Sequence, residues 1–330
     1  MTTPLVGTLR AAYPDARIDY AVGEWARPAV AHSPDIDEVL PLFDAAAPRY
    51  KRLLQALRSA FRLRWRRYDV AFVPDRAPMT ALVAYFAGVP RRFGIAGQGR
   101  GAFLTHTIHD QPQHHDVDVY LRLADAAGLG DGIKYEKKYV PTQVALEKAL
   151  QYLQAQGFDE LPFRLAMFAG GGSSTGRAFY HKRWDPERYA LLANQVIGRY
   201  GGGVILLGDA AERELNFVIR NDIDYPVLDL TGRTDVDAMA AVMQLCDAVI
   251  SNDSGPMHLA VSVGTPTVGI FGPTSARNSG PYGARHRAVQ SHIYCGPCAR
   301  QGGPMEGCGA ACIQRITVQD LLTVLEAQAG

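Results

Sequence analysis

The sequence has almost no net charge and no apolar run long enough to cross a membrane. Its 34 Lys and Arg residues nearly balance its 33 Asp and Glu residues, which gives a formal net charge of +1. This balance does not indicate a nucleic-acid partner. No stretch approaches the ~20 consecutive apolar residues of a membrane span, and no signal peptide precedes the first helical pattern. We therefore expect a cytoplasmic protein.

Cysteine is also scarce, and its distribution argues against a fold held together by disulfides. Four of the five cysteines lie close together in the sequence, at Cys295, Cys298, Cys308 and Cys312. The spacing of the first pair is that of a metal knuckle, and four thiolates could hold a structural zinc ion. Reduced surface thiols, or disulfides if the chain is oxidised, are the alternative. The fifth, Cys246, lies in an apolar helical pattern and is expected in the core.

Two common phosphate-binding fingerprints are missing. The glycine-rich residues 97–101 lack both the spacing of a dinucleotide loop and its strand-to-helix context. Residues 170–177 are rich in Gly and Ser but lack the Gly-Lys-Ser/Thr ending of a Walker loop. The second loop nevertheless follows an apolar strand pattern and precedes Lys182. It offers the backbone donors, hydroxyls and mobile cation that a diphosphate needs, although a flexible linker explains the loop alone equally well.

The sequence does contain two successive series of short apolar strands and amphipathic helices, separated by residues 158–162. Its length fits about two domains at ~150 residues each. We predict an α/β protein with domains at 1–157 and 163–316, followed by a helix at 317–330. The first domain begins with a helical pattern, whereas a doubly wound domain normally begins with a strand and a ligand-binding loop.

The most informative stretch runs from 248 to 271, where an apolar strand leads through a polar loop into a helix and a second strand. Such a loop lies at the carboxyl end of a strand, where open α/β sheets bind ligands. Asp253 or Ser254 can cap the helix, and Gly255 allows close approach of a ligand to the backbone. The free N–H groups at the helix start can hold a phosphate, and His258 lies one turn further on.

For Asp-Ser-Gly alone, a capped helix with a core-facing histidine would be the simpler interpretation. Polar loops also follow the strands that end near Ser173, Gly208 and Thr231. Because parallel strands end at one edge of a sheet, these loops predict a single ligand site.

A dense run of cations marks residues 49–67, which are predicted to form a helix. Its basic residues are Arg49, Lys51, Arg52, Arg58, Arg62, Arg64, Arg66 and Arg67. A solvated helix face is the commoner meaning of such a run. The functional alternative is attraction to an anionic acceptor or to an anionic membrane surface. Because the neighbouring sequence lacks a strongly apolar insertion face, we expect surface contact at most.

The string Asn-Asp-Ser-Gly-Pro-Met-His-Leu-Ala at residues 252–260 closely resembles the nucleotide-sugar loop of glycosyltransferase family 9, the ADP-heptose:lipopolysaccharide heptosyltransferases. Residues 2–20 and 264–273 add to the similarity, which extends over most of the chain. The resemblance implies a GT-B fold, in which two Rossmann-like domains face a cleft and bind the acceptor and the donor respectively. It also implies that the final helix packs back toward the first domain.

The implied reaction is inverting transfer of a heptose or related sugar from an ADP-sugar to a lipopolysaccharide inner-core or other anionic glycan acceptor, at the inner face of the inner membrane. Lys182 and the helix after Asp253 would stabilise the leaving diphosphate, so no cofactor is required. An acidic residue, Glu212, would bind the ribose. The full set of implied donor-binding residues is Ser173, Ser174, Lys182, Glu212, Asp253, Ser254, Gly255 and His258.

The catalytic base has no clear place in this sequence. In the family it is an Asp after the first strand, and that position would lie before Met1. Either the true start lies upstream, or the protein lacks both strand and base. We favour the first, because loss of a central parallel strand would expose two ladders and a large apolar face. Asp75, at the end of a predicted strand, is the fallback candidate.

Two other functions are consistent with these residues. A catalytically impaired family member could bind a nucleotide sugar or glycan as a scaffold, and the missing base favours that. An epimerase of the UDP-sugar type shares the fold, although nothing in the sequence requires it. Retention of the whole donor loop favours the transferase.

Overall fold

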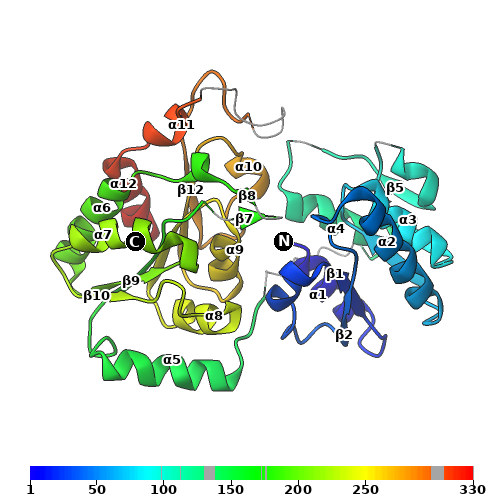
Figure 1. The fold of residues 1–330 in the computed structure, drawn as a ribbon, viewed down its shortest axis with the longest axis horizontal. Coiled ribbons are helices and arrows are strands. Elements are labelled where there is room, and N and C mark those ends of the chain that lie inside the picture. Colours follow the sequence, from blue (N-terminus) through cyan, green and yellow to red (C-terminus); the bar gives the residue numbers. More distant parts are fainter. Residues whose placement is uncertain are drawn as a thin grey trace. The chain divides into compact units, whose positions relative to one another are not determined.

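The computed structural model describes residues 1–97, 99–111, 113–129, 138–171, 173–174, 177–298 and 308–329. The chain divides into two compact α/β units, Met1–Lys137 and Lys138–Gly330 (Figure 1). Among the described helices, none is both long enough and apolar enough to cross a membrane.

The second unit is built on a six-stranded parallel sheet with the strand order β10-β9-β6-β11-β12-β13. This is the strand order of a doubly wound nucleotide-binding fold, in which the chain starts in the middle and builds outward in both directions. The predicted second Rossmann-like domain is therefore confirmed. The strands are β6 (Arg164–Phe168), β9 (Gly203–Leu207), β10 (Val227–Asp229), β11 (Ala248–Asn252), β12 (Thr267–Phe271) and β13 (Arg287–Gln290).

Helices cover both faces of this sheet, so its central strands are apolar on both sides. One face packs against α6 (Pro186–Tyr200), α7 (Arg213–Asn221) and α12 (Val318–Ala329). The other packs against α5 (Gln143–Ala155), α8 (Val236–Gln244) and α9 (Gly255–Ser262). Shorter elements complete the unit: β7 (Ser173–Ser174), β8 (Arg177–Ala178), η3 (Tyr180–Lys182), η4 (Ala210–Glu212), α10 (Ala276–Ser279) and α11 (Ala311–Gln314).

The boundary between the units lies earlier than residues 158–162, where we expected it. Helix α5 belongs to the second unit and packs on α8. Asp237 of α8 anchors its start, because its carboxylate accepts hydrogen bonds from the Tyr139 hydroxyl at 3.1 Å and the Thr142 hydroxyl at 2.5 Å. Phe158, in the expected linker, is buried in the same core.

The last helix also differs from its prediction. We expected it to return toward the first domain, but α12 packs on α6, β12 and β13 of the second unit, and Leu321 is fully buried there. The preceding turn is held by Trp184, whose indole N–H donates to the carbonyl of Ile316 at 2.9 Å.

The first unit contains two separate parallel sheets. One pairs β1 (Asp19–Val22) with β2 (Glu38–Pro41), and the other has the order β3-β4-β5. In the described residues no ladder joins β1 to β3, and the first element is a helix, α1. The remaining elements are α1 (Thr3–Ala12), η1 (Glu24–Ala29), α2 (Arg49–Arg64), β3 (Val70–Val73), α3 (Pro78–Phe86), β4 (Arg91–Ile95), η2 (Arg100–Phe103), β5 (His106–Ile108) and α4 (Asp116–Ala126).

Helices also cover the larger sheet of this unit. Leu5 of α1 and Leu123 of α4 pack on Phe93 and Ile95 of β4. On β3, Val73 packs with Ala81 and Ala84 of α3. The layers of an α/β unit are therefore present.

Helix α2 carries the predicted cations, but its surface is not only charged. Leu57, Phe61 and Trp65 are 45%, 63% and 74% exposed. The expectation that this region lacks an apolar face is therefore wrong. That expectation rested on the charged residues alone, whereas apolar residues recur at helical spacing between the charged ones.

Candidate active site

The candidate site lies where the strand order reverses, between β6 and β11. Their ladder runs to Ser251 opposite Phe168, so both strands end at the same edge. In doubly wound sheets this switch point opens a crevice in which ligands bind. The loops after the two strands are the two that the sequence marks as phosphate-binding candidates.

Asn252 ties these two loops together. Its side-chain amide donates to the carbonyls of Ala169 at 2.7 Å and Gly170 at 3.2 Å. Its side-chain oxygen accepts from the backbone N–H of Trp184 at 3.3 Å. The residue is completely buried. This role of Asn252 was not predicted, although its place at the head of the Asn-Asp-Ser-Gly string was a usable signal.

The structure brings together two predicted site residues, Lys182 and Asp253. Lys182 Nζ lies 2.7 Å from Asp253 Oδ2, and the side chains are 18% and 9% exposed. Lys182 ends η3, and its ammonium also lies 5.2 Å from the centre of the Phe179 ring. The site thus holds a cation in place beside the start of α9.

The start of α9 has no side-chain cap and an unobstructed glycine. Ser254 occupies the capping position without a side-chain cap bond. Its hydroxyl lies 3.1 Å from that of Ser251, and Asp253 is paired with Lys182, so the predicted capping by either residue is wrong. Gly255 is exposed, and a methyl group added there would meet no heavy atom within 4 Å. Packing within the protein therefore does not require glycine at this position.

His258 lies on α9, and the two serines lie on a short hairpin. His258 is half-buried in the first turn of α9. Ser173 and Ser174 form β7, which pairs with β8 in a short antiparallel hairpin after β6. The side chains of these serines lie outside the part of the chain that the structure describes.

Glu212 is buried beneath the loop after β6. Its side chain is 4% exposed, and Oε2 accepts a hydrogen bond from the Asp209 N–H at 3.1 Å. Arg183 Nη2 lies 3.7 Å from Oε1. A Cβ atom added to Gly170 would lie 1.5 Å from that oxygen, so the carboxylate packs directly on the loop backbone. Burial raises the pKa of the Glu212 carboxyl.

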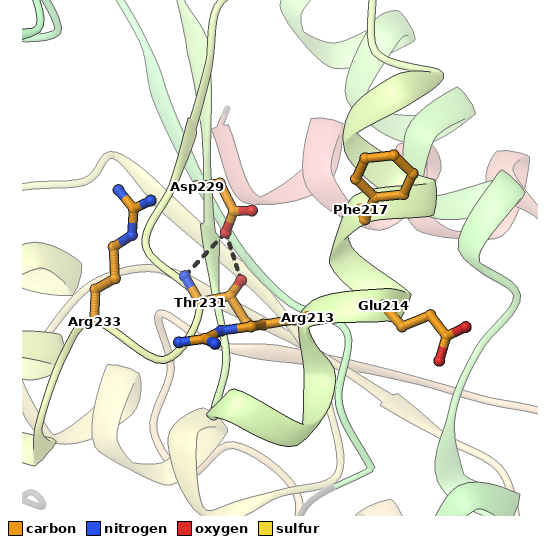
Figure 2. A pocket seen from close by; sticks show the side chains of 6 residues that line it. All are labelled: Arg213, Glu214, Phe217, Asp229, Thr231 and Arg233. Atoms are coloured by element: carbon orange, nitrogen blue, oxygen red, sulfur yellow. Dashed lines mark hydrogen bonds between the residues drawn. The ribbon is translucent and has the colours of Figure 1, made fainter.

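A cavity of about 700 Å³ lies further along the same edge, at the carboxyl end of β10 (Figure 2). Asp229 Oδ1 accepts from the Thr231 N–H at 2.9 Å and from its hydroxyl at 2.5 Å. These are the strand end and loop that the sequence predicted to face a ligand. The cavity is lined by Arg213, Glu214, Phe217, Asp229, Thr231 and Arg233.

In the first unit, the fallback base Asp75 has a local structural role. Its Oδ1 accepts from the Ala77 N–H at 2.9 Å, and its Oδ2 accepts from the Thr80 hydroxyl. Both oxygens thus fix the start of α3.

The neighbouring Arg76 forms a cluster that was not predicted from the sequence. Its guanidinium contacts Asp110 Oδ2 at 2.8 Å and Asp116 Oδ1 at 2.8 Å, which raises the pKa of the arginine. Tyr120 lies alongside, and burial raises its pKa to about 12. The sequence signal for this cluster was a cation after one strand and acidic residues after another. Arg76 follows β3, and Asp110 and Asp116 follow β5.

The cysteines are free thiols in the structure. Cys246 is buried, and burial raises its pKa to about 12, as expected of a core residue. Burial also raises the pKa of Cys312, and the nearby Cys308, Cys298 and Cys295 act in the same direction. In the part of the chain that the structure describes, no group of three or more metal-ligating side chains is arranged to hold an ion.

The architecture is that of the GT-B glycosyltransferases. A solved structure of a family 9 glycosyl transferase from Veillonella parvula matches with a TM-score of 0.82 at 22% identity, covering 99% of this chain and 92% of the other. The structure of Escherichia coli ADP-heptose lps heptosyltransferase II matches with a TM-score of 0.75 at 25% identity, covering 99% and 93%.

The chain belongs to glycosyltransferase family 9 (heptosyltransferase), whose model matches residues 56–308. Lipopolysaccharide heptosyltransferase 2 of Escherichia coli K12 is 29% identical over 99% of this chain and 94% of its own length. The enzyme of the same name from Salmonella typhimurium is 28% identical over 88% and 84%. The protein is therefore a glycosyltransferase of the heptosyltransferase family, and these similarities do not favour a scaffold or an epimerase.

Proposed function

We propose that the protein transfers a heptose from an ADP-heptose donor to an inner-core lipopolysaccharide acceptor, with inversion at the sugar. The names of the relatives support the sugar and the acceptor. The observation that carries the proposal is the placement of Lys182 and Asp253 at the switch point, against the start of α9, which has no side-chain cap. A cation and a helix N-terminus are what a departing diphosphate needs.

The donor-binding roles follow from this placement. Lys182 and the N–H groups at the start of α9 would stabilise the diphosphate, with Ser173 and Ser174 contributing from the loop after β6. Asp253, Ser254, Gly255 and His258 would hold the donor. Glu212 is the proposed ribose-side acid, and its bond to Asp209 also fixes the loop that begins η4.

The acceptor hydroxyl must lose a proton during the transfer, which calls for a general base. Asp75 stays the fallback candidate of the first unit, but its carboxylate already accepts two local hydrogen bonds. We therefore propose that Asp75 positions α3 and that another carboxylate takes the proton.

We also propose that transfer requires no cofactor, and that a structural zinc ion at the four clustered cysteines would lie apart from the chemistry. Treatment with a chelator should leave the rate of ADP release unchanged. A metal assay on the purified protein tests the zinc separately. A rate that falls with chelation and returns with a divalent cation would contradict the cofactor-free mechanism.

The working place we propose is the cytoplasmic face of the inner membrane, reached through the basic helix α2. An anionic acceptor embedded in that membrane would present its phosphates and carboxylates to the cations of α2. Cell fractionation with and without a high-salt wash tests this proposal.

The direct test of activity follows ADP release from ADP-heptose with and without a Kdo-containing acceptor. We expect release that depends on the acceptor. Binding of ADP-heptose without release, measured by calorimetry, would indicate a scaffold instead. Conversion of the sugar without any acceptor would indicate an epimerase.

A further inference from the structure

Helix α2 has two apolar faces, of which only one is used inside the protein. The buried face places Ala56 and Ala60 against Phe43 and Val83. The second face is a solvent-exposed stripe at helical spacing, and its members lie within about 120° of the helix circumference at 100° per residue. The stripe comprises Tyr50, Leu53, Leu54, Leu57, Phe61 and Trp65, which are 45% to 74% exposed.

Two aromatic side chains of the exposed stripe contact each other. Phe61 and Trp65 contact each other edge to face, with ring centres 5.9 Å apart. Single exposed apolar residues are normal on a protein surface, but six on one helix face form a patch that indicates a binding surface.

Cations border this stripe. Lys51, Arg58 and Arg62 are exposed and follow it around the helix on the side away from the core. Within the described ranges, no ion pair joins these three side chains to a carboxylate. No acidic residue occurs between Arg49 and Arg67.

Aromatic side chains continue the surface on the neighbouring helix. Helix α3 packs on α2, and Gly88 just beyond its end lies beside the guanidinium of Arg64. Tyr85 and Phe86, in the last turn of α3, are 46% and 48% exposed. Tyr85 also lies under the guanidinium of Arg92, at 5.3 Å.

We propose that α2 lies in the plane of an anionic phospholipid surface and inserts its apolar stripe between the lipids. Interfacial helices bury Leu, Phe and Trp at the boundary of headgroups and acyl chains and keep Lys and Arg among the headgroups. Trp65 and Tyr50, at opposite ends of α2, are of the residue types that concentrate at this boundary. The inference rests on the membrane contact proposed above and adds insertion to it.

Charge decides between a membrane and a second copy of the chain. In a symmetric dimer through this face, Lys51, Arg58 and Arg62 would meet the same cations, with no acid on the helix to offset them. An anionic bilayer is instead complementary to both the stripe and its border. The exposed stripe is therefore more complementary to an anionic lipid surface than to the same face of a second copy of the chain.

Tryptophan fluorescence tests insertion directly. The chain has three tryptophans, of which Trp184 is buried and Trp25, at 65% exposure, lies outside α2. The purified full chain is mixed with phosphatidylglycerol-containing vesicles whose phosphatidylcholine carries brominated acyl chains. We expect quenching in the wild type and in Trp25→Phe, and its loss in Trp65→Phe. Binding without quenching of Trp65 would overturn insertion.

Vesicle sedimentation tests the stripe as a whole. Leu57→Ser combined with Phe61→Ser should lower partitioning onto anionic vesicles about tenfold or more, because exposed apolar surface is removed. Leu191→Ser is the matched control, since Leu191 on α6 has the same chemistry and is 48% exposed against 45% for Leu57. Thermal unfolding checks that each variant is folded.

These results separate insertion from the proposed transferase activity, because vesicle binding requires neither donor nor acceptor. Equal partitioning of the double variant and the wild type would overturn the role of the stripe. The membrane assignment would also be overturned if the wild type formed a dimer in solution, the double variant did not, and neither protein bound vesicles. That outcome would assign the face to a second copy.

Discussion

Lys182 Nζ and Asp253 Oδ2 lie 2.7 Å apart and join the two loops at the switch point of the second unit. The lysine follows β6 and the aspartate follows β11, so the contact depends on the parallel pairing of these strands. The pair holds the ammonium beside the start of α9, where the leaving diphosphate is proposed to bind.

The first prediction concerns the cation of this pair. Lys182→Ala should lower kcat for ADP release about 100-fold or more, because a donor that stabilises developing negative charge is lost. Lys182→Arg, which keeps a charge of different shape, should retain more activity. Lys148→Ala, on the exposed side of α5, is the control and should behave as the wild type. Steady-state kinetics measure all three, and full activity of Lys182→Ala would contradict the assignment.

The second prediction contrasts two glycines. Gly170→Ala would place a methyl group 1.5 Å from Glu212 Oε1, so we expect a loss of about 1–3 kcal/mol in the free energy of unfolding. Gly255→Ala meets no protein atom and should change stability by less than about 0.5 kcal/mol. It should nevertheless raise KM for the donor if the ligand approaches this backbone.

Denaturant titrations and donor kinetics distinguish the two glycine variants. Equal stability of both would show that the loop after β6 moves away from Glu212 at no cost. An unchanged KM in Gly255→Ala would place the donor elsewhere.

The third prediction uses the raised pKa of Glu212. A buried acid with a raised pKa binds more protons in the folded state, so it lowers stability as pH rises through the window above the ordinary glutamate value. Glu212→Gln keeps an acceptor for the Asp209 N–H and removes this loss. Its stability relative to the wild type should therefore be greater at pH 7 than at pH 4. A difference independent of pH, in thermal unfolding across that range, would contradict the raised pKa.

The fourth prediction concerns Asp75. Since its carboxylate fixes the start of α3, Asp75→Asn should cost about 1 kcal/mol in stability and lower the transfer rate less than tenfold. Asp125→Asn, on the exposed side of α4, serves as the control. A loss of activity of several orders of magnitude with intact folding would make Asp75 the base.

Much of the second unit could be predicted from the sequence because its signals are local. Apolar strands followed by polar loops are visible without a structure, and the parallel rule then brings Lys182 near Asp253. The position of Glu212 could not be predicted in the same way. Glu212 is buried because it packs on Gly170, which follows a different strand, β6. The loop sequence does not determine this contact.

Non-local packing also explains the wrong domain boundary. Helix α5 looks like the end of the first series, yet Asp237 of α8 holds its start, and no local pattern signals that contact. For α2 the local pattern shows only part of the surface. The cations are obvious in the sequence, whereas the apolar stripe appears only when the buried side of the helix is known.

The most direct test of the proposed function identifies the product. The acceptor is incubated with ADP-heptose and either the wild type or Lys182→Ala, and is then examined by mass spectrometry and by NMR of the new linkage. We predict that the wild type adds one heptosyl residue with inverted anomeric configuration and that the variant adds almost none. An unmodified acceptor together with free heptose, or equal product from both proteins, would contradict the account.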